Sequence, residues 1–380
     1  MATWSELLED QIFIEAADLG KLERNAIKSI LEPALREARS EMMKVLLEQW
    51  DSLTWNNRDR LRAFIQTFTG MLDQKGIKPI EAEMTPLLNN LVVGTYAQAA
   101  TEINTVLKLP LLATTAPPAF FSKVIDRTLI EGQPLFSYLK KDGSPGWWDS
   151  LGGSSRDRIA RDVRKSLLMG ESTQQATRRL LGKARGDVTH GALGVTKRQA
   201  EAVARTSIHA VTNATRSQFY EDNNDIVEGI SSLATLDSRT TILCRAYDGL
   251  KWRLPDYKPI GGHGKAYLPP PRHWRCRSVL TPILAGLDDI DKRAKEMGLE
   301  LEPTIRAARD GPRERKSISG NMDGWLRTQN EEKQNAMLGK GRAQLWREGK
   351  VTLQDLINAQ GETIPLENLR KIATRRSALN

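Results

Sequence analysis

Residues 233–283 read LATLDSRTTILCRAYDGLKWRLPDYKPIGGHGKAYLPPPRHWRCRSVLTPI, a pattern unlike the rest of the chain. They contain both cysteines, Cys244 and Cys276, and two of the four histidines, His263 and His273. Short apolar runs are separated here by turn-forming residues, including three consecutive prolines at 269–271. Such short runs between breakers favour strands over helices. We therefore expect a compact, short-stranded module that carries the cysteines and histidines.

Turn signals within this stretch predict the order of its strands. Residues 233–236 are expected to be a strand that runs into a turn or the start of a short helix, where Asp237 is in a position to cap the next backbone N–H groups. The pair Asp248-Gly249 supports a tight hairpin turn, so residues 251–254 are the expected return strand. Residues 279–283 are the expected closing strand.

Outside this module, apolar residues recur at helical spacing. Residues 6–19, 30–46, 56–72 and 80–109 all show the pattern, with Gly76 and Pro79 expected to separate the last two helices. Helices of this kind bury their apolar stripes against one another, which predicts a bundle. The predicted fold class is mainly α with a small α+β core.

Composition divides the chain into four predicted parts. Residues 1–109 are an N-terminal helical region, and residues 110–153 are a linker or arm rich in Pro, Gly and Trp. Residues 154–283 form the core, in which basic helices precede the Cys/His module, and residues 284–380 form a helical C-terminal region with a basic tail. Two interpretations stay open for Trp147 and Trp148: burial in a neighbouring domain, or an exposed arm that docks on another subunit.

Composition also excludes several classes of protein. The 380 residues are 39% hydrophobic and 27% charged, with a formal net charge of +9, which favours an anionic partner. Two cysteines are too few for a disulfide-dense secreted scaffold. There is no 18-residue apolar run and no basic start, so we expect neither a transmembrane helix nor a secretory signal.

Most of the positive charge lies between residues 151 and 217, where thirteen Lys and Arg face five Asp and Glu. Clustered cations can contact phosphates without reading base sequence, and they can equally face an acidic protein. Because no aromatic residues interleave with them, a stacking surface for single strands is not expected. The residues predicted to bind DNA or a partner are Arg161, Arg164, Lys165, Arg178, Arg179, Lys183, Arg185, Lys197 and Arg198.

Several short motifs occur in a distinctive order. A helix with Arg205-Thr206 precedes L-A-T-L-D-x-R-T at 233–240, Cys244, Asp248-Gly249, H-x-x-C-R at 273–277 and V-L-T-P at 279–282. The tail adds W-L-x-x-Q at 325–329, L-G-K-x-R at 338–342 and P-L-E-N-L at 365–369. Over residues 150–370 this order resembles the phage Mu F-like minor head proteins, also called the phage head morphogenesis family.

The resemblance implies a ligand pattern of C-x-x-C followed by H-x-x-C-x-C, whose spacing suits a four-coordinate zinc site. This chain departs from the pattern at Thr241 and Ser278, which stand where the first and last cysteines would be. Neutral hydroxyls are poor zinc ligands, so a complete zinc site is not expected.

Three interpretations of the remaining pattern residues stay open. Cys244 and Cys276 could form a disulfide or a buried thiol pair, which is our first choice. They could hold zinc together with His273, with His263 as a further candidate ligand, or they could be ordinary core cysteines. No resident cofactor is predicted.

The chain contains no P-loop, GxSxG or HExxH motif, and no acid is placed to orient a Cys–His pair, so catalysis is not predicted. The resemblance implies a structural minor head protein of a tailed bacteriophage, assembled in the host cytoplasm and located inside the capsid or at the portal vertex of the virion. The expected partners are the portal protein, the major capsid protein and double-stranded DNA, with several copies per virion. The alternative function is a cytosolic non-specific DNA-binding protein.

Overall fold

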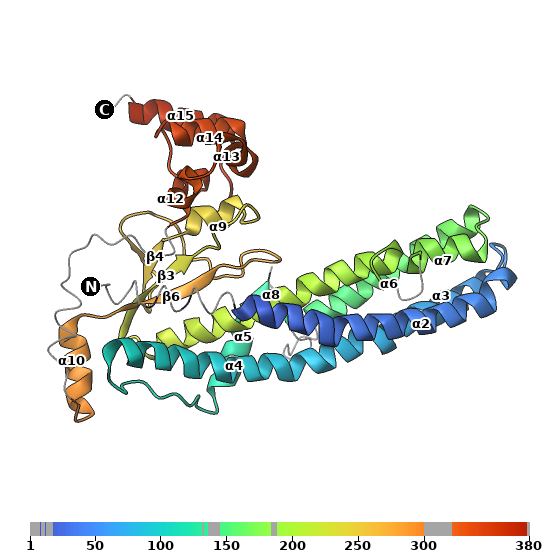
Figure 1. The fold of residues 1–380 in the computed structure, drawn as a ribbon, viewed down its shortest axis with the longest axis horizontal. Helices are drawn as coiled ribbons and strands as arrows, with labels where there is room; N and C mark the ends of the chain where they lie inside the picture. The colour runs from blue at the N-terminus through green and yellow to red at the C-terminus, as the bar shows by residue number, and fades with distance from the viewer. Residues whose placement is uncertain are drawn as a thin grey trace. The chain divides into compact units, whose positions relative to one another are not determined.

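The computed structural model describes residues 8, 12, 18–130, 133–135, 145–183, 188–299 and 321–377. These residues are mainly helical, with one four-stranded antiparallel sheet and one two-stranded hairpin (Figure 1). The predicted fold class, mainly α with a small α+β part, is confirmed. Among the described residues, no helix combines the length and apolar character needed to cross a membrane.

The chain forms two compact units, each built from segments that are far apart in the sequence. We call Leu19–Leu91 with Ile125–Val211 the helical unit, and Met1–Asp18 with Val92–Val124 and Thr212–Asn380 the sheet unit. Two of the boundaries between them fall inside long helices, α4 (Lys78–Leu107) and α8 (Gly191–Asp222), and a third falls inside α5 (Phe120–Arg127). The four-part division drawn from composition stays a prediction.

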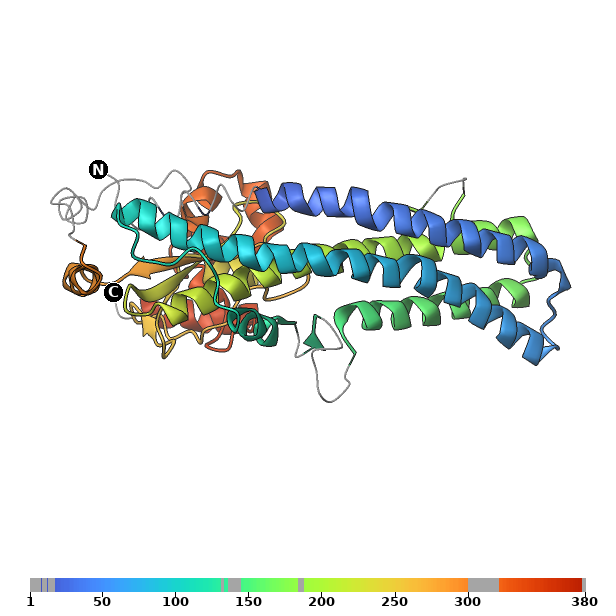
Figure 2. The same cartoon turned by 90° about the horizontal axis from the view of Figure 1, so that it is seen from below.

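The helical unit is held together by the apolar faces of its helices. α3 (Arg58–Leu72) begins at Asn57, whose side-chain oxygen accepts a hydrogen bond from the Arg60 N–H at 3.1 Å. The helix then buries apolar residues at steps of three and four, among them the stacked rings of Phe64 and Phe68. Burying one such side chain contributes about 1.5–3 kcal/mol. α3 packs against α2 (Glu32–Gln49) and α6 (Trp147–Leu168), and α7 (Thr173–Leu181) packs against α2 and α6 (Figure 2).

The remaining elements of the helical unit are η1 (Ile27–Leu31), η2 (Trp50–Ser52), η3 (Asp73–Ile77), β1 (Leu129–Ile130), β2 (Gln133–Pro134) and the first parts of α4 and α8.

The expected helix break at Gly76 is wrong. Gly76 is buried within η3, a π-helical turn that continues α3 into α4, and a Cβ added to it would lie 3.3 Å from Ala38. Gly76 is therefore a packing glycine. Pro79 is the second residue of α4, directly after η3, and it does not end the helical run either.

Trp147 and Trp148 lie in the first turn of α6, and both are buried. The Trp147 indole N–H donates to the carbonyl of Gln133 at 2.9 Å. The interpretation as buried side chains is confirmed, and the exposed docking arm is excluded for these two residues.

The sheet unit is built around β3 (Val227–Leu233), the longest strand. It pairs with β6 (Val279–Leu284) on one side and with β4 (Lys251–Arg253) on the other, and β5 (Pro259–Ile260) completes the order β5-β4-β3-β6. Gly229 allows the close approach of β4, because a Cβ there would lie 2.7 Å from the Trp252 carbonyl oxygen. The expected closing strand at 279–283 is confirmed as β6, whereas the run 233–236 starts at Leu233, the last residue of β3, and continues beyond the strand.

The predicted hairpin at Asp248-Gly249 is wrong for its first strand. The residues before it form a short helix, α9 (Ile242–Tyr247), which begins because the Thr241 hydroxyl accepts a hydrogen bond from the Cys244 N–H at 3.3 Å. Gly249 has a φ of +73° and turns the chain from this helix into β4. The return strand exists, but it pairs with β3.

The other helices of the sheet unit are α5 (Phe120–Arg127, up to Val124), α10 (Leu287–Glu296), α12 (Met322–Arg327), α13 (Glu331–Leu338), α14 (Lys340–Arg347), η5 (Gln354–Leu356) and α15 (Leu366–Ser377).

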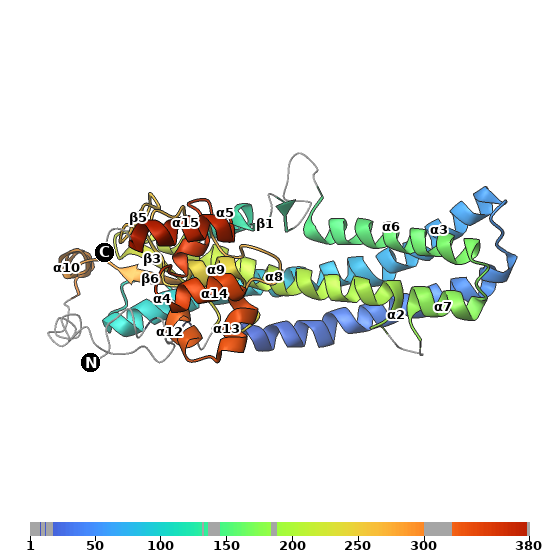
Figure 3. The ribbon, with the colours of Figure 1, turned by 90° about the horizontal axis from the view of Figure 1, so that it is seen from above.

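The C-terminal helices α12 to α15 pack over α9 (Figure 3). They share one apolar core, which includes Leu326, Trp346 and Leu369 and also contains Cys244 and Cys276. The cysteines therefore lie where the C-terminal helices join the sheet module.

Candidate metal centre

Three side chains from distant segments meet beside the sheet. Cys244 comes from α9, and His273 and Cys276 come from the loop that leads into β6. The two sulfur atoms are 3.6 Å apart, and the Cys244 sulfur is 3.2 Å from His273 Nε2. A disulfide bond is about 2.05 Å long, so the cysteines are a free thiol pair in this structure. We call Cys244, His273 and Cys276 the thiol–histidine trio.

Backbone hydrogen bonds position the loop that carries two members of the trio. The Cys276 N–H donates to the His273 carbonyl at 3.0 Å, which closes a turn, and Arg275 within it has a φ of +64°. The Asn213 side chain on α8 donates to the Ser278 carbonyl at 3.1 Å, and the Thr235 hydroxyl donates to the Arg277 carbonyl at 3.2 Å. The entry of the loop into β6 is therefore held from both sides.

Electrostatics favour a thiolate at Cys244. The pKa of Cys244 is lowered, first because the Cys276 thiol donates to it and then because His273 does, although burial acts in the opposite direction. The pKa of Cys276 is raised by the same hydrogen bond and by burial. The hydrogen bond to Cys244 also raises the pKa of His273. A thiolate is the form that binds metals and that oxidises, so both reactions are chemically accessible here.

The geometry of the trio fits three zinc ligands. With Zn–S about 2.3 Å and Zn–N about 2.0 Å, tetrahedral geometry separates two sulfurs by about 3.8 Å and a sulfur from a nitrogen by about 3.5 Å. The observed 3.6 and 3.2 Å are close to these values. His273 Nδ1 lies 2.9 Å from the Trp274 carbonyl, so Nδ1 carries the proton that it donates and Nε2 faces the sulfur. Metal-bound histidines typically have this orientation.

The fourth position is where the centre differs from a closed zinc site. Thr241 and Ser278 both line a small pocket with Cys244 and His273, so the structure brings the two substituted positions to the site as neutral hydroxyls. The Thr241 hydroxyl is 3.0 Å from His273 Nε2. The Ser278 hydroxyl is buried beside Cys244, and it contributes to lowering the pKa of Cys244.

His263 lies outside the trio. Its Nε2 is 2.9 Å from the Lys251 carbonyl, and its Nδ1 accepts a hydrogen bond from the Lys265 N–H at 3.1 Å. Both ring nitrogens are thus engaged in holding the loop after β5, and His263 is not a fourth ligand.

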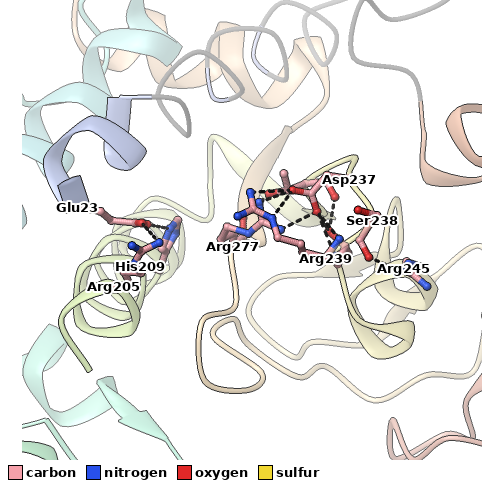
Figure 4. Close-up of polar contacts among 10 residues, drawn as sticks. Glu23, Arg205, His209, Asp237, Ser238, Arg239, Arg245 and Arg277 are labelled. Carbon is pink, nitrogen blue, oxygen red and sulfur yellow. Dashed lines mark hydrogen bonds and ion pairs between the residues drawn. The ribbon is translucent and has the colours of Figure 1, made fainter. Parts of the chain in front are cut away.

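Asp237 holds residues that line this pocket, among them Arg239 and Arg277 (Figure 4). Arg277 donates to both of its carboxylate oxygens at 2.7 Å, and the Arg239 and Thr240 N–H groups donate to it at 3.0 and 3.1 Å, which confirms its predicted capping role. Burial alone would raise its pKa, but the hydrogen bonds and charge of Arg277 outweigh burial and hold the pKa well below the usual range. Arg245 donates to the carbonyls of Ser238 and Met337 and so ties this loop to α13.

Sequence reasoning missed the part played by Asp248, which was assigned only to a turn. Its carboxylate accepts hydrogen bonds from the N–H groups of Ala234 at 2.8 Å and Met322 at 2.7 Å. Burial raises the pKa of Asp248 to about 6. One buried carboxylate thus joins the end of β3 to the start of α12, a contact that no local sequence signal reveals.

The predicted basic residues fall into two groups in the helical unit. Lys197 is 2.9 Å from Glu32, and Arg179 is paired with Glu171. Arg205 and the buried His209, which were not among the predicted binding residues, both contact the Glu23 carboxylate (Figure 4). Part of the positive charge is therefore neutralised by acids of this chain.

The second group is exposed. Arg161, Arg164, Lys165 and Arg178 are exposed and make no ion pair within the described part of the chain. Arg198 donates to the Thr189 carbonyl at 3.2 Å, Lys183 is exposed, and Arg185 lies outside the described residues.

Residues 157–281 match the family model described as Phage Mu protein F like protein. This region of the chain is similar to the phage Mu F-like proteins. The resemblance is thereby confirmed over residues 157–281, whereas the motifs at 325–369 lie outside the match. The match runs from α6 into β6 and includes both the basic helices and the trio. The family implies a structural role in phage head morphogenesis. No curated protein and no solved structure matched the chain.

Proposed function

We propose that this chain is a structural minor head protein of a tailed bacteriophage, incorporated at the portal vertex in several copies. The observation that carries the proposal is the phage Mu F-like match over residues 157–281, because that family acts in head morphogenesis. The proposed partners are the portal protein and the major capsid protein. The exposed cations of the helical unit support binding to an anionic surface in either partner.

The composition of purified heads tests this proposal. Heads assembled with and without the portal protein would be analysed by quantitative mass spectrometry. We expect the chain in portal-containing heads, at far fewer copies than the major capsid protein, and its loss when the portal is omitted. Absence from portal-containing heads, with the chain left in the soluble fraction bound to DNA, would support the cytosolic DNA-binding alternative.

Double-stranded DNA is the second candidate partner, favoured by the exposed Arg161, Arg164, Lys165 and Arg178. Each phosphate contact contributes about 0.9 to the slope of log K against log salt. Gel shifts with linear duplex at rising salt should therefore show a shallower slope for Arg178→Glu than for Arg179→Glu, whose side chain is already paired with Glu171. Equal slopes for wild type and both variants would exclude DNA contact by α7.

We further propose that the thiol–histidine trio stabilises the fold, without catalysis and without a resident metal. Its two cysteines are buried in the core that they share with the C-terminal helices, and hydroxyls occupy the places of two thiolates. Metal analysis of the purified, reduced protein should give well below one zinc per chain, whereas one zinc per chain would establish a three-ligand site.

A further inference from the structure

Two corners of the helical unit lie together at one of its ends. α2 and α3 are joined at residues 50–57, and α6 and α7 are joined at residues 169–172. The Trp50 indole N–H donates to the Glu171 carbonyl at 3.0 Å, and the Thr173 hydroxyl donates to the Asp51 carboxylate at 2.5 Å. All three ribbon views show both turns at the same end of this unit (Figures 1–3).

These corners carry a cluster of exposed apolar side chains, which we call the apolar tip. It consists of Leu47 (62% exposed), Trp55 (44%), Leu168 (63%) and Met169 (61%). Half of the eight large exposed apolar residues in the described chain thus lie in these two turns or in the last turn of the helices that lead into them. Single exposed apolar residues need no explanation, but a group on one surface marks an interaction site.

The apolar tip has a positively charged border. Arg164 lies one helical turn before Leu168, and Lys165 lies one turn before Met169, so each cation shares a face of α6 with an apolar tip residue. Both cations are exposed and make no ion pair in the described structure. The same is true of Arg58 at the start of α3 and of Arg178 on α7. Of the acids at these corners, Asp51 and Glu171 are engaged by Thr173 and by Arg179, and Asp59 lies 3.9 Å from Arg62, whereas Glu48 is exposed. The cations still outnumber the acids between residues 44 and 62 and between residues 161 and 179.

We propose that the apolar tip docks on an acidic protein surface that presents apolar side chains at its centre. This inference rests on the proposed function, because it states which part of the chain meets the portal or capsid protein and with what chemistry. Aromatic and large aliphatic side chains anchor protein interfaces, and a charged border steers the partner. A second copy would bring like charges together at this end, and duplex DNA offers phosphates but little apolar surface to match Trp55 and Leu168.

Binding of full-length chain to the purified portal protein and the purified major capsid protein of the same phage tests the proposal. The variants are Trp55→Ser and the double change Leu168→Ser with Met169→Ser. The matched controls are Val93→Ser and Met297→Ser in the sheet unit, which remove side chains of comparable exposure, 59% and 47%. Because all these side chains are exposed, thermal melts should stay unchanged, and that measurement confirms folding.

We expect wild type and both controls to bind one of the two proteins, with affinity that falls as salt rises. The tip variants should bind at least tenfold more weakly, and Arg164→Glu with Lys165→Glu should weaken binding and flatten its salt dependence.

If the tip variants bind as tightly as the wild type, the apolar tip is not the docking surface, and the proposed function is unaffected. No binding of wild type to either protein would overturn both. Sedimentation that shows self-association lost in the tip variants would assign the surface to a second copy, and loss of duplex binding alone would assign it to DNA. Either result contradicts the proposal.

Discussion

The helical unit and the Cys/His module are stabilised in different ways. In the helical unit, apolar residues one turn apart pack between neighbouring helices, and most ion pairs, such as Arg156 with Asp73, keep a partly exposed side chain, although His209 and Glu23 are buried. In the module, buried polar groups join segments that are distant in sequence, as Asp248 joins Ala234 and Met322. A buried donor without a partner costs far more than an exposed ion pair contributes. Single polar substitutions should therefore cost more stability in the module than in the helical unit.

The largest loss is expected at Asp248. Asp248→Ala leaves the Ala234 and Met322 N–H groups buried without an acceptor, which costs about 2–4 kcal/mol of unfolding free energy. Denaturant unfolding of the full chain measures this loss. Asp248→Asn keeps one acceptor oxygen and should give a smaller loss. A loss below about 0.5 kcal/mol for Asp248→Ala would contradict the claim that polar substitutions cost more stability in the module than in the helical unit.

The next largest effect is a gain at the trio. Ser278→Cys places a third thiolate beside Cys244, His273 and Cys276 and completes a four-ligand set. We expect one zinc per chain in this variant, and stabilisation by about 2.7 kcal/mol when free zinc is a hundredfold above its dissociation constant. Metal analysis and melting with and without zinc measure both effects. Ser231→Cys, a buried serine on β3, is the control and should bind none.

A smaller, pH-dependent loss is expected at Asp237. Because Arg277 and Arg239 lower its pKa in the folded state, its contribution is present above the ordinary Asp range and is lost as pH falls through that range toward the folded pKa. Asp237→Asn should cost about 1 kcal/mol at pH 7 and progressively less below pH 4. Unfolding curves of both proteins from pH 7 to pH 3 test this. A gap that widens toward low pH would contradict the assigned direction of the pKa shift.

The smallest effects are expected among the cations of the helical unit. Lys197→Ala removes the contact with Glu32 and should cost about 0.5–1 kcal/mol, because the Lys197 side chain is mostly buried. Arg161→Ala should change stability by less than about 0.5 kcal/mol, since the side chain is exposed and unpaired among the described residues. Denaturant unfolding of the two variants separates paired from free cations. Equal losses would remove that distinction.

The sequence alone predicted most helices of the helical unit and the closing strand β6, and it gave the grouping of Cys244, His273 and Cys276 as one of three interpretations. Helical periodicity arises from contacts one turn apart, so it can be read locally, and the ordered motifs carried the family pattern. The Asp248-Gly249 turn was placed correctly, but Thr241 caps a helix there, and a capping hydroxyl can precede either a helix or a turn.

Only the tertiary structure decided which polar groups are buried and which cations are free. Arg179 and Arg178 are neighbours with the same chemistry, yet one is paired with Glu171 and the other is exposed. Asp248 became a link between β3 and α12 because folding brought two unpartnered N–H groups to its carboxylate. Pairing and burial depend on which distant segments meet in space, and that information is absent from any local stretch of the chain.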